Sequence, residues 1–95
     1  MELKELVEES HKIAKSKGFW DRNNIPEKLM LIVTEIGEAC EADRTSDFDN
    51  FKEEIADTFI RLADLCGYLG IDIEKEIEIK TAINRKRPKK HNKRY

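Results

Sequence analysis

Apolar residues recur every three or four positions along residues 48–69, and this spacing places them on one face of an α-helix. The members of this stripe are Phe48, Phe51, Ile55, Phe59, Leu62, Cys66 and Leu69. Charged residues make up 40% of the chain and fill the positions between the apolar ones, so each helix can present a polar face to water. A helix with so long an apolar seam needs neighbouring helices, and the pattern therefore predicts a helical bundle.

Three further helices are predicted, and no segment has the alternating pattern of a strand. The predicted helices span residues 2–17, 26–44, 47–69 and 72 to about 88. Pro26 lies in the first turn of the second helix, where its missing N–H costs nothing. Asp72 is a suitable N-cap for the fourth helix, which must end near Pro88.

These helices predict a single all-α domain over residues 1–95, with a basic tail from about residue 88. The second and third helices are joined by a short connection, so we expect an antiparallel pair at the centre of a four-helix bundle-like subunit. The predicted core stripe of the second helix consists of Leu29, Ile32, Val33, Ile36 and Cys40. A chain of 95 residues buries only a modest core, so self-association would stabilise it.

No membrane segment is expected, because the longest apolar run, residues 29–33, is far too short to span a bilayer. The acidic, amphipathic first ten residues are unlike a signal or transit peptide, and we expect a cytoplasmic protein. Cys40 and Cys66 fall on apolar helix stripes and lack a C-x-x-C spacing. They are therefore predicted to be buried thiols in a reducing compartment.

Glu35 and Glu38 interrupt an otherwise apolar helix, and Glu54 and Asp57 repeat the arrangement on the third helix. Residues three apart share a helix face, so antiparallel neighbours would bring four carboxylates into one groove. Four such groups repel one another unless cations neutralise them, and oxygen ligands alone select Mg²⁺ or Mn²⁺. The alternative is an ordinary solvated acidic face paired with Lys and Arg.

Neither histidine lies on the second or third helix, since His11 precedes them and His91 follows them. A ferritin-like di-iron site requires a Glu-x-x-His motif on such helices, so the sequence argues against one.

The fourth helix carries a polar stripe at positions i, i+4 and i+7, formed by Lys80, Asn84 and Arg87. Lys and Arg bind phosphates, and an amide can bond to phosphate or sugar oxygens. The end of the chain is strongly basic. Residues 85–95, which include Arg87, contain seven Lys or Arg and no acid, whereas residues 1–84 hold 11 basic and 20 acidic side chains. The stripe is either a phosphate site or a solvated basic face.

The order E-x-x-E, 15 intervening residues, E-x-x-D and then K-x-x-x-N-x-x-R-P resembles the MazG-type all-α nucleoside triphosphate pyrophosphohydrolases. The resemblance covers about residues 26–91. It implies Mg²⁺-dependent hydrolysis of an NTP or dNTP to the monophosphate and pyrophosphate, by a homodimer or homotetramer with sites near subunit interfaces. Members often continue with His-Gly, whereas His91 here precedes Asn92.

The resemblance also implies roles for individual residues. The metal ligands would be Glu35, Glu38, Glu54 and Asp57, and the groups that hold phosphates or sugar would be Lys80, Asn84 and Arg87. Either Glu35 or Glu38 would take a proton from the attacking water. The segment "KGFWD" resembles a loop that some members place near the nucleobase, so Trp20 is a candidate stacking platform. The alternative for Trp20 is an aromatic plug between helices or subunits.

Two other classes of function are compatible with the same residues. In a nucleic-acid-binding module, the basic tail would make the contacts and binding would fall steeply with salt. In a helical oligomerisation domain without chemistry, Glu35 and Glu38 would be exposed surface residues. The combined motifs favour the hydrolase, so a nucleoside triphosphate and further copies of the chain are the expected partners, rather than nucleic acid or a membrane.

Overall fold

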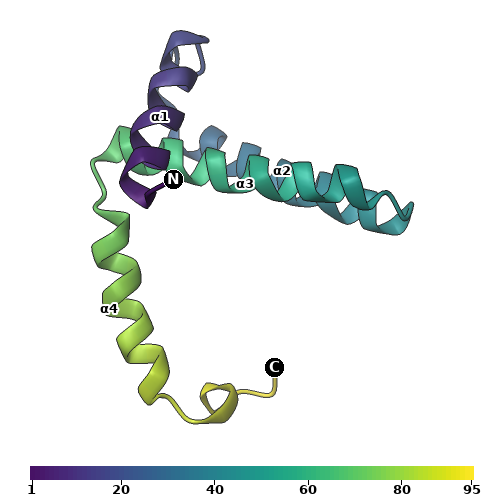
Figure 1. Cartoon of the computed structure of the whole chain (residues 1–95), viewed down its shortest axis with the longest axis vertical. Helices are drawn as coiled ribbons and strands as arrows, with labels where there is room; N and C mark the ends of the chain where they lie inside the picture. Colours follow the sequence, from purple (N-terminus) through teal and green to yellow (C-terminus); the bar gives the residue numbers. More distant parts are fainter.

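The computed structural model covers residues 1–95 and is entirely helical, without a strand, which confirms the all-α prediction (Figure 1). The elements are α1 (Leu3–Ser16), α2 (Ile25–Arg44), α3 (Phe48–Leu69), α4 (Ile73–Lys86) and a short 3₁₀ segment, η1 (Lys89–Asn92). Each of the four predicted helices is present, and the boundaries agree within two residues. None of the helices combines the length and apolar character that crossing a bilayer requires.

Side-chain caps define where three of the helices begin. The Asn24 carboxamide oxygen accepts from the Glu27 N–H at 3.1 Å, and the Asp47 carboxylate accepts from the Asn50 N–H at 3.1 Å. Asp72 caps α4 in the same way, at 3.2 Å from the Lys75 nitrogen. Each cap satisfies an N–H that has no partner within its helix, so the local sequence specifies these boundaries.

The packed part of the chain consists of α1, α2 and α3. The helices α2 and α3 form an antiparallel hairpin closed by the turn at residues 45–47, and α1 packs across α3 (Figure 1). The buried apolar residues are Ile32, Ala39, Ala42, Ala63, Leu65 and Cys66. Half of these are alanines, whose small side chains let the two hairpin helices approach closely. Burial raises the pKa of the Cys66 thiol, which agrees with its predicted place in the core.

The predicted four-helix bundle is wrong for the single chain, because α4 does not pack against the hairpin. It has no buried residue and extends away from the other helices (Figure 1). The cause is the joint before it, where Gly70 adopts φ +67° and the Ile71 N–H donates to the Cys66 carbonyl at 3.0 Å. This Schellman-type ending and the Asp72 cap fix the direction in which α4 leaves α3.

The predicted core stripe of α2 is also wrong in part, since only Ile32 of its five members is buried. Val33 is 54% exposed and Phe59 on α3 is 63% exposed. We call this exposed surface the apolar face; it consists of Leu29, Val33, Ile36, Phe48, Ile55, Phe59 and Leu62. Cys40 is likewise exposed rather than buried. The hairpin interior is instead lined by the adjacent stripe of small residues, so the larger side chains remain outside.

Candidate metal centre and adjoining cavity

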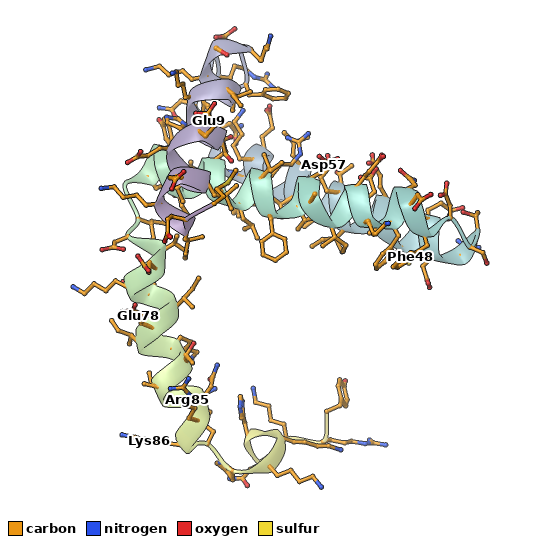
Figure 2. The ribbon with its side chains drawn as sticks, in the orientation of Figure 1. Glu9, Phe48, Asp57, Glu78, Arg85 and Lys86 are labelled. Atoms are coloured by element: carbon orange, nitrogen blue, oxygen red, sulfur yellow. The ribbon has the colours of Figure 1, made fainter.

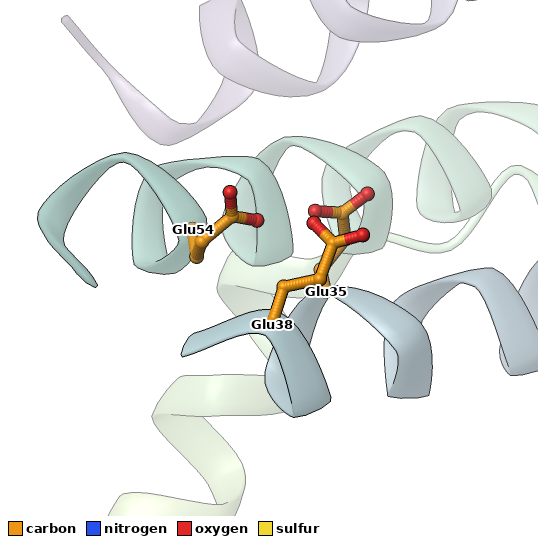
Figure 3. Close-up of side chains that lie close together, drawn as sticks. All are labelled: Glu35, Glu38 and Glu54. Atoms are coloured by element: carbon orange, nitrogen blue, oxygen red, sulfur yellow. The ribbon is translucent and has the colours of Figure 1, made fainter. Parts of the chain in front are cut away.

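Three of the four predicted carboxylates converge where α2 and α3 face each other (Figure 3). Glu35 and Glu38 come from successive turns of α2, and Glu54 comes from α3. One oxygen from each of the three lies within 4.8 Å of the others. Glu35 is buried, Glu54 is half-buried and Glu38 is exposed, so the cluster opens from the helix interface towards solvent.

Asp57 lies outside this close group. It is exposed on the next turn of α3, and together with Glu35 it lines a cavity between α1 and the hairpin. Figure 2 shows Asp57 on the edge of α3 nearer α1, whereas Phe48 lies on the opposite edge. The predicted carboxylate pair of α3 is therefore divided between the close group and the cavity wall.

Glu35 has a cationic partner that the sequence analysis did not identify. The Arg61 Nε–H donates to the Glu35 carboxylate at 2.9 Å. Burial acts to raise the pKa of Glu35, but the hydrogen bond and positive charge of Arg61 outweigh it and hold that pKa below its ordinary value. Glu35 is therefore a charged carboxylate at neutral pH, although it is buried.

Glu54 is in the opposite electrostatic situation, because no cation pairs with it. The adjoining carboxylates of Glu38 and Glu35, together with partial burial, raise the pKa of Glu54 to about 7. Its Oε2 atom is buried and has no hydrogen-bond partner. A buried carboxylate oxygen without a partner is costly, and it leaves one ligand position of the cluster unsatisfied.

The cavity beside the cluster has a volume of about 430 Å³. Its walls are largely apolar, with Leu6 and Ile13 from α1, Phe19 from the loop after α1 and Ile60 from α3. Its polar lining consists of Glu9, Ser10, Glu35, Asp57, Arg61 and Asp64. Volume and lining are typical of a small-molecule pocket.

The sequence contained a signal for part of this lining. Asp57, Arg61 and Asp64 are spaced i, i+4 and i+7, so they form a polar stripe along one face of α3. No sequence pattern predicts which residues of α1 line the cavity, because this depends on how α1 crosses the hairpin.

Trp20 is held inside the chain by several contacts. Its ring stacks on Tyr68 with centroids 3.9 Å apart and an angle of 6° between the planes. Its Nε1–H donates to the Asp64 carboxylate at 2.8 Å, and His11 Nδ1 lies 2.9 Å from the same oxygen. The Lys28 ammonium lies 4.9 Å from the ring centroid. These contacts match the aromatic plug that the sequence left open as the alternative to base stacking.

The polar stripe of α4 does not lie beside the carboxylates within one chain, although the roles that the resemblance implies would bring the two groups to one substrate. Lys80 and Asn84 are exposed on α4, which extends away from the hairpin. Arg87 follows the end of the helix in an extended conformation, and its guanidinium donates to His91 Nδ1 at 3.2 Å. The direction of α4 set by Gly70 separates the two groups of residues that the family motif combines.

Comparison of the chain with protein-family models, with curated proteins and with solved structures found no match. The case for a function therefore rests on the residues themselves. The donor set of the cluster consists only of carboxylate oxygens, which are the ligands that Mg²⁺ and Mn²⁺ prefer. The partnerless Glu54 oxygen is what such an ion would satisfy, so the residues fit a hard divalent cation.

Proposed function

We propose that this chain is a metal-dependent hydrolase that converts a nucleoside triphosphate, an NTP or a dNTP, to the monophosphate and pyrophosphate. The observation that carries the proposal is the convergence of Glu35, Glu38 and Glu54 from two helices, with one buried oxygen left without a partner. A purely solvated acidic face would keep each carboxylate in water or paired with a base. The MazG-type motif order adds support for the choice of substrate.

Glu35, Glu38 and Glu54 would hold Mg²⁺ or Mn²⁺, and Asp57, which lines the cavity together with Glu35, would contribute from the cavity side. When bound, such an ion supplies positive charge to phosphate oxygens and increases the acidity of water. The carboxylates fix where that charge is placed, because they project from two packed helices rather than from loops.

The protein groups have separate tasks in this proposal. Arg61 keeps Glu35 ionised and in one orientation, and it also lines the cavity, where a guanidinium can stabilise phosphate charge. No cation pairs with Glu38, so Glu38 is the freer of the two glutamates to accept a proton from the attacking water. The apolar walls of the cavity exclude water from the part of the substrate they enclose.

The cavity is the place for the nucleoside, because it begins at Glu35 and Asp57 and is lined by apolar residues. A base in this cavity would contact Phe19 and Asp64, and Asp64 accepts the indole N–H of Trp20. With its ring stacked on Tyr68, Trp20 would support the cavity wall indirectly, through Asp64. If this stack opened, Trp20 would become the stacking platform that the sequence suggested.

We further propose that the chain acts as a homodimer or homotetramer in the cytoplasm. The exposed apolar face needs cover, and the chain buries few residues on its own. The two free cysteines agree with a reducing compartment.

The test is a panel of NTPs and dNTPs with Mg²⁺ and with Mn²⁺, assayed for pyrophosphate. We expect pyrophosphate from at least one nucleotide, none in EDTA, and a loss of about a hundredfold or more in Glu38→Gln. Glu41→Gln, on the next turn of α2, is the matched control and should retain activity. Metal-independent binding of DNA or RNA without release of pyrophosphate would support the exposed basic tail as the functional element instead.

A further inference from the structure

Two carboxylates of the cavity lining have no part in the metal centre, Glu9 on α1 (Figure 2) and Asp64 on α3. The lining holds four carboxylates but a single guanidinium, and this guanidinium, Arg61, already donates to Glu35. An ionised carboxylate can only accept hydrogen bonds. A ligand that fills this cavity therefore meets mostly acceptors, and it must supply the donors itself.

Asp64 is held in place through one of its two oxygens. Its Oδ1 accepts from the Trp20 indole N–H at 2.8 Å and lies 2.9 Å from His11 Nδ1. The ring of Trp20 stacks on Tyr68, and the ring of His11 meets both of these rings edge-on, with centroids 5.8 and 6.0 Å away. The hydrogen bonds between the carboxylate and the protein all fall on Oδ1, which leaves Oδ2 free to accept from a ligand.

The position of Asp64 along α3 suits contact with the base rather than with the phosphates. Asp64 follows Asp57 by seven residues, which corresponds to two helical turns and about 10 Å along the axis. Phosphates bound at the metal centre would lie near Asp57. The base is separated from them by the sugar, so it would reach the part of the cavity that Asp64 lines.

The nucleobases differ in what they offer to an acceptor at this place. Adenine, cytosine and guanine carry an exocyclic amino group, whereas uracil and thymine carry carbonyl oxygens instead. An amino group would donate to Oδ2 of Asp64. A carbonyl oxygen would set two acceptors against each other in a largely apolar cavity, and each would lose its hydrogen bonds to water without gaining another.

We infer that Asp64 selects a nucleobase with an exocyclic amino group and rejects uracil and thymine. Trp20 and His11 are positioning residues for this selection, because they orient the carboxylate through Oδ1. Trp20 thereby contributes to base recognition while its ring stays stacked on Tyr68. The inference rests on the proposed function for the triphosphate, but the selection of the base can also be measured on nucleosides.

The first test compares nucleotides that differ in the amino group. CTP and UTP form the pyrimidine pair, and ATP and its analogue without the amino group form the purine pair. We expect the nucleotide with the amino group to be favoured by about tenfold to a hundredfold in kcat/KM in at least one pair. A preference for UTP over CTP, or equal rates within both pairs, would overturn the inference.

Asp64→Asn separates recognition from a structural role. The Trp20 N–H can only donate, so the amide oxygen of the variant keeps the place of Oδ1 and its NH₂ group takes the place of Oδ2. The variant therefore offers a donor to the base, and we expect it to favour UTP over CTP and to lose the preference for ATP. A carboxylate that only held Trp20 and His11 would affect both members of a pair alike. Asp43→Asn, on the exposed side of α2, is the matched control and should keep the wild-type order.

Binding of nucleosides to the whole chain in EDTA separates this inference from hydrolysis. Trp20 is the only tryptophan, and it contacts Asp64, so its fluorescence can follow the titration. We expect cytidine to bind more tightly than uridine, or adenosine more tightly than purine riboside, and Asp64→Asn to abolish or reverse that order. A chain that shows this order but releases no pyrophosphate would defeat the proposed function and support the inference. Pyrophosphate release without discrimination, or discrimination unchanged in Asp64→Asn, would overturn the inference and leave the proposed function intact.

Discussion

At the scale of single residues, the surroundings lower the pKa of Glu35 and raise the pKa of Glu54. Arg61 pairs with Glu35 and keeps it charged, whereas Glu54 has only other carboxylates beside it. The folded chain therefore contains a conflict that a cation or a proton relieves. The sequence predicted the convergence of carboxylates, but it did not predict which of them would have a cation beside it.

The raised pKa of Glu54 makes stability depend on pH in a defined direction. Its pKa rises from 4.5 to about 7 on folding, so its protonated form stabilises the fold below pH 4.5 and this stabilisation is lost as the pH rises through 7. Glu54→Gln mimics the protonated state at every pH. In EDTA, we expect the variant to melt above wild type at pH 8 and close to it at pH 5. An equal difference at both values would contradict the assignment.

Removing Arg61 should expose the cost of the buried Glu35 carboxylate. Arg61→Ala leaves that charge without its partner, and we expect a loss on the order of 2 kcal/mol in the free energy of unfolding in EDTA. Millimolar Mg²⁺ should restore part of the loss, since a cation at the cluster replaces the missing charge. Double variants that combine Arg61→Ala with Glu35→Gln, measured by urea titration, should be more stable than Arg61→Ala alone. The reverse order would show that Arg61 acts by packing only.

At the scale of helices, local signals predicted the elements well and their packing less well. Asn24, Asp47 and Asp72 are caps whose effect is confined to one turn, so the sequence predicts them directly. Whether a given apolar stripe is buried depends on which helix packs against it. The interior of the hairpin contains the small residues Ala39, Ala42 and Ala63. The large apolar residues that the sequence pattern assigned to the core instead form the exposed apolar face.

The crossing of α1 over α3 depends on Gly67. A Cβ there would lie 2.7 Å from the His11 Cβ and 3.2 Å from the Val7 carbonyl oxygen, so Gly67→Ala must push α1 away. We expect a destabilisation of about 1–3 kcal/mol. Gly37→Ala on α2 is the matched control, because a Cβ there meets nothing within 4 Å, and it should be neutral or stabilising by up to about 1 kcal/mol. Chemical denaturation measures both, and similar values for the two would contradict the close packing of α1.

At the scale of the whole molecule, the single chain leaves α4 without a packing partner and leaves the apolar face exposed, and the proposed oligomer would cover this face. The apolar and polar stripes of α4 did not predict its direction, because that direction is set by the turn of the chain at Gly70. The separation of Lys80 and Asn84 from the carboxylates follows from the same cause.

Disrupting the apolar face should therefore change the assembly before it changes the helices. Phe59→Asp places a charge on this face, on a residue that is 63% exposed in the single chain. We expect light scattering to report monomers and the melting temperature to fall, with helical circular dichroism largely retained at low temperature. Glu53→Gln, on the polar side of α3, is the control. A Phe59→Asp protein with unchanged mass and melting temperature would show that this face is not an interface.

The measurement that bears most directly on the central claim is the change in unfolding free energy on adding Mg²⁺ or Mn²⁺, compared across carboxylate variants. An ion that binds only the folded protein stabilises it by about 2.7 kcal/mol at a hundredfold excess over its dissociation constant. We expect this gain for wild type and for Glu41→Gln, and its loss in Glu38→Gln and in Glu54→Gln. A loss in Asp57→Asn as well would show that Asp57 contributes to the site. An equal gain in wild type, Glu38→Gln and Glu54→Gln would contradict a metal centre at these residues.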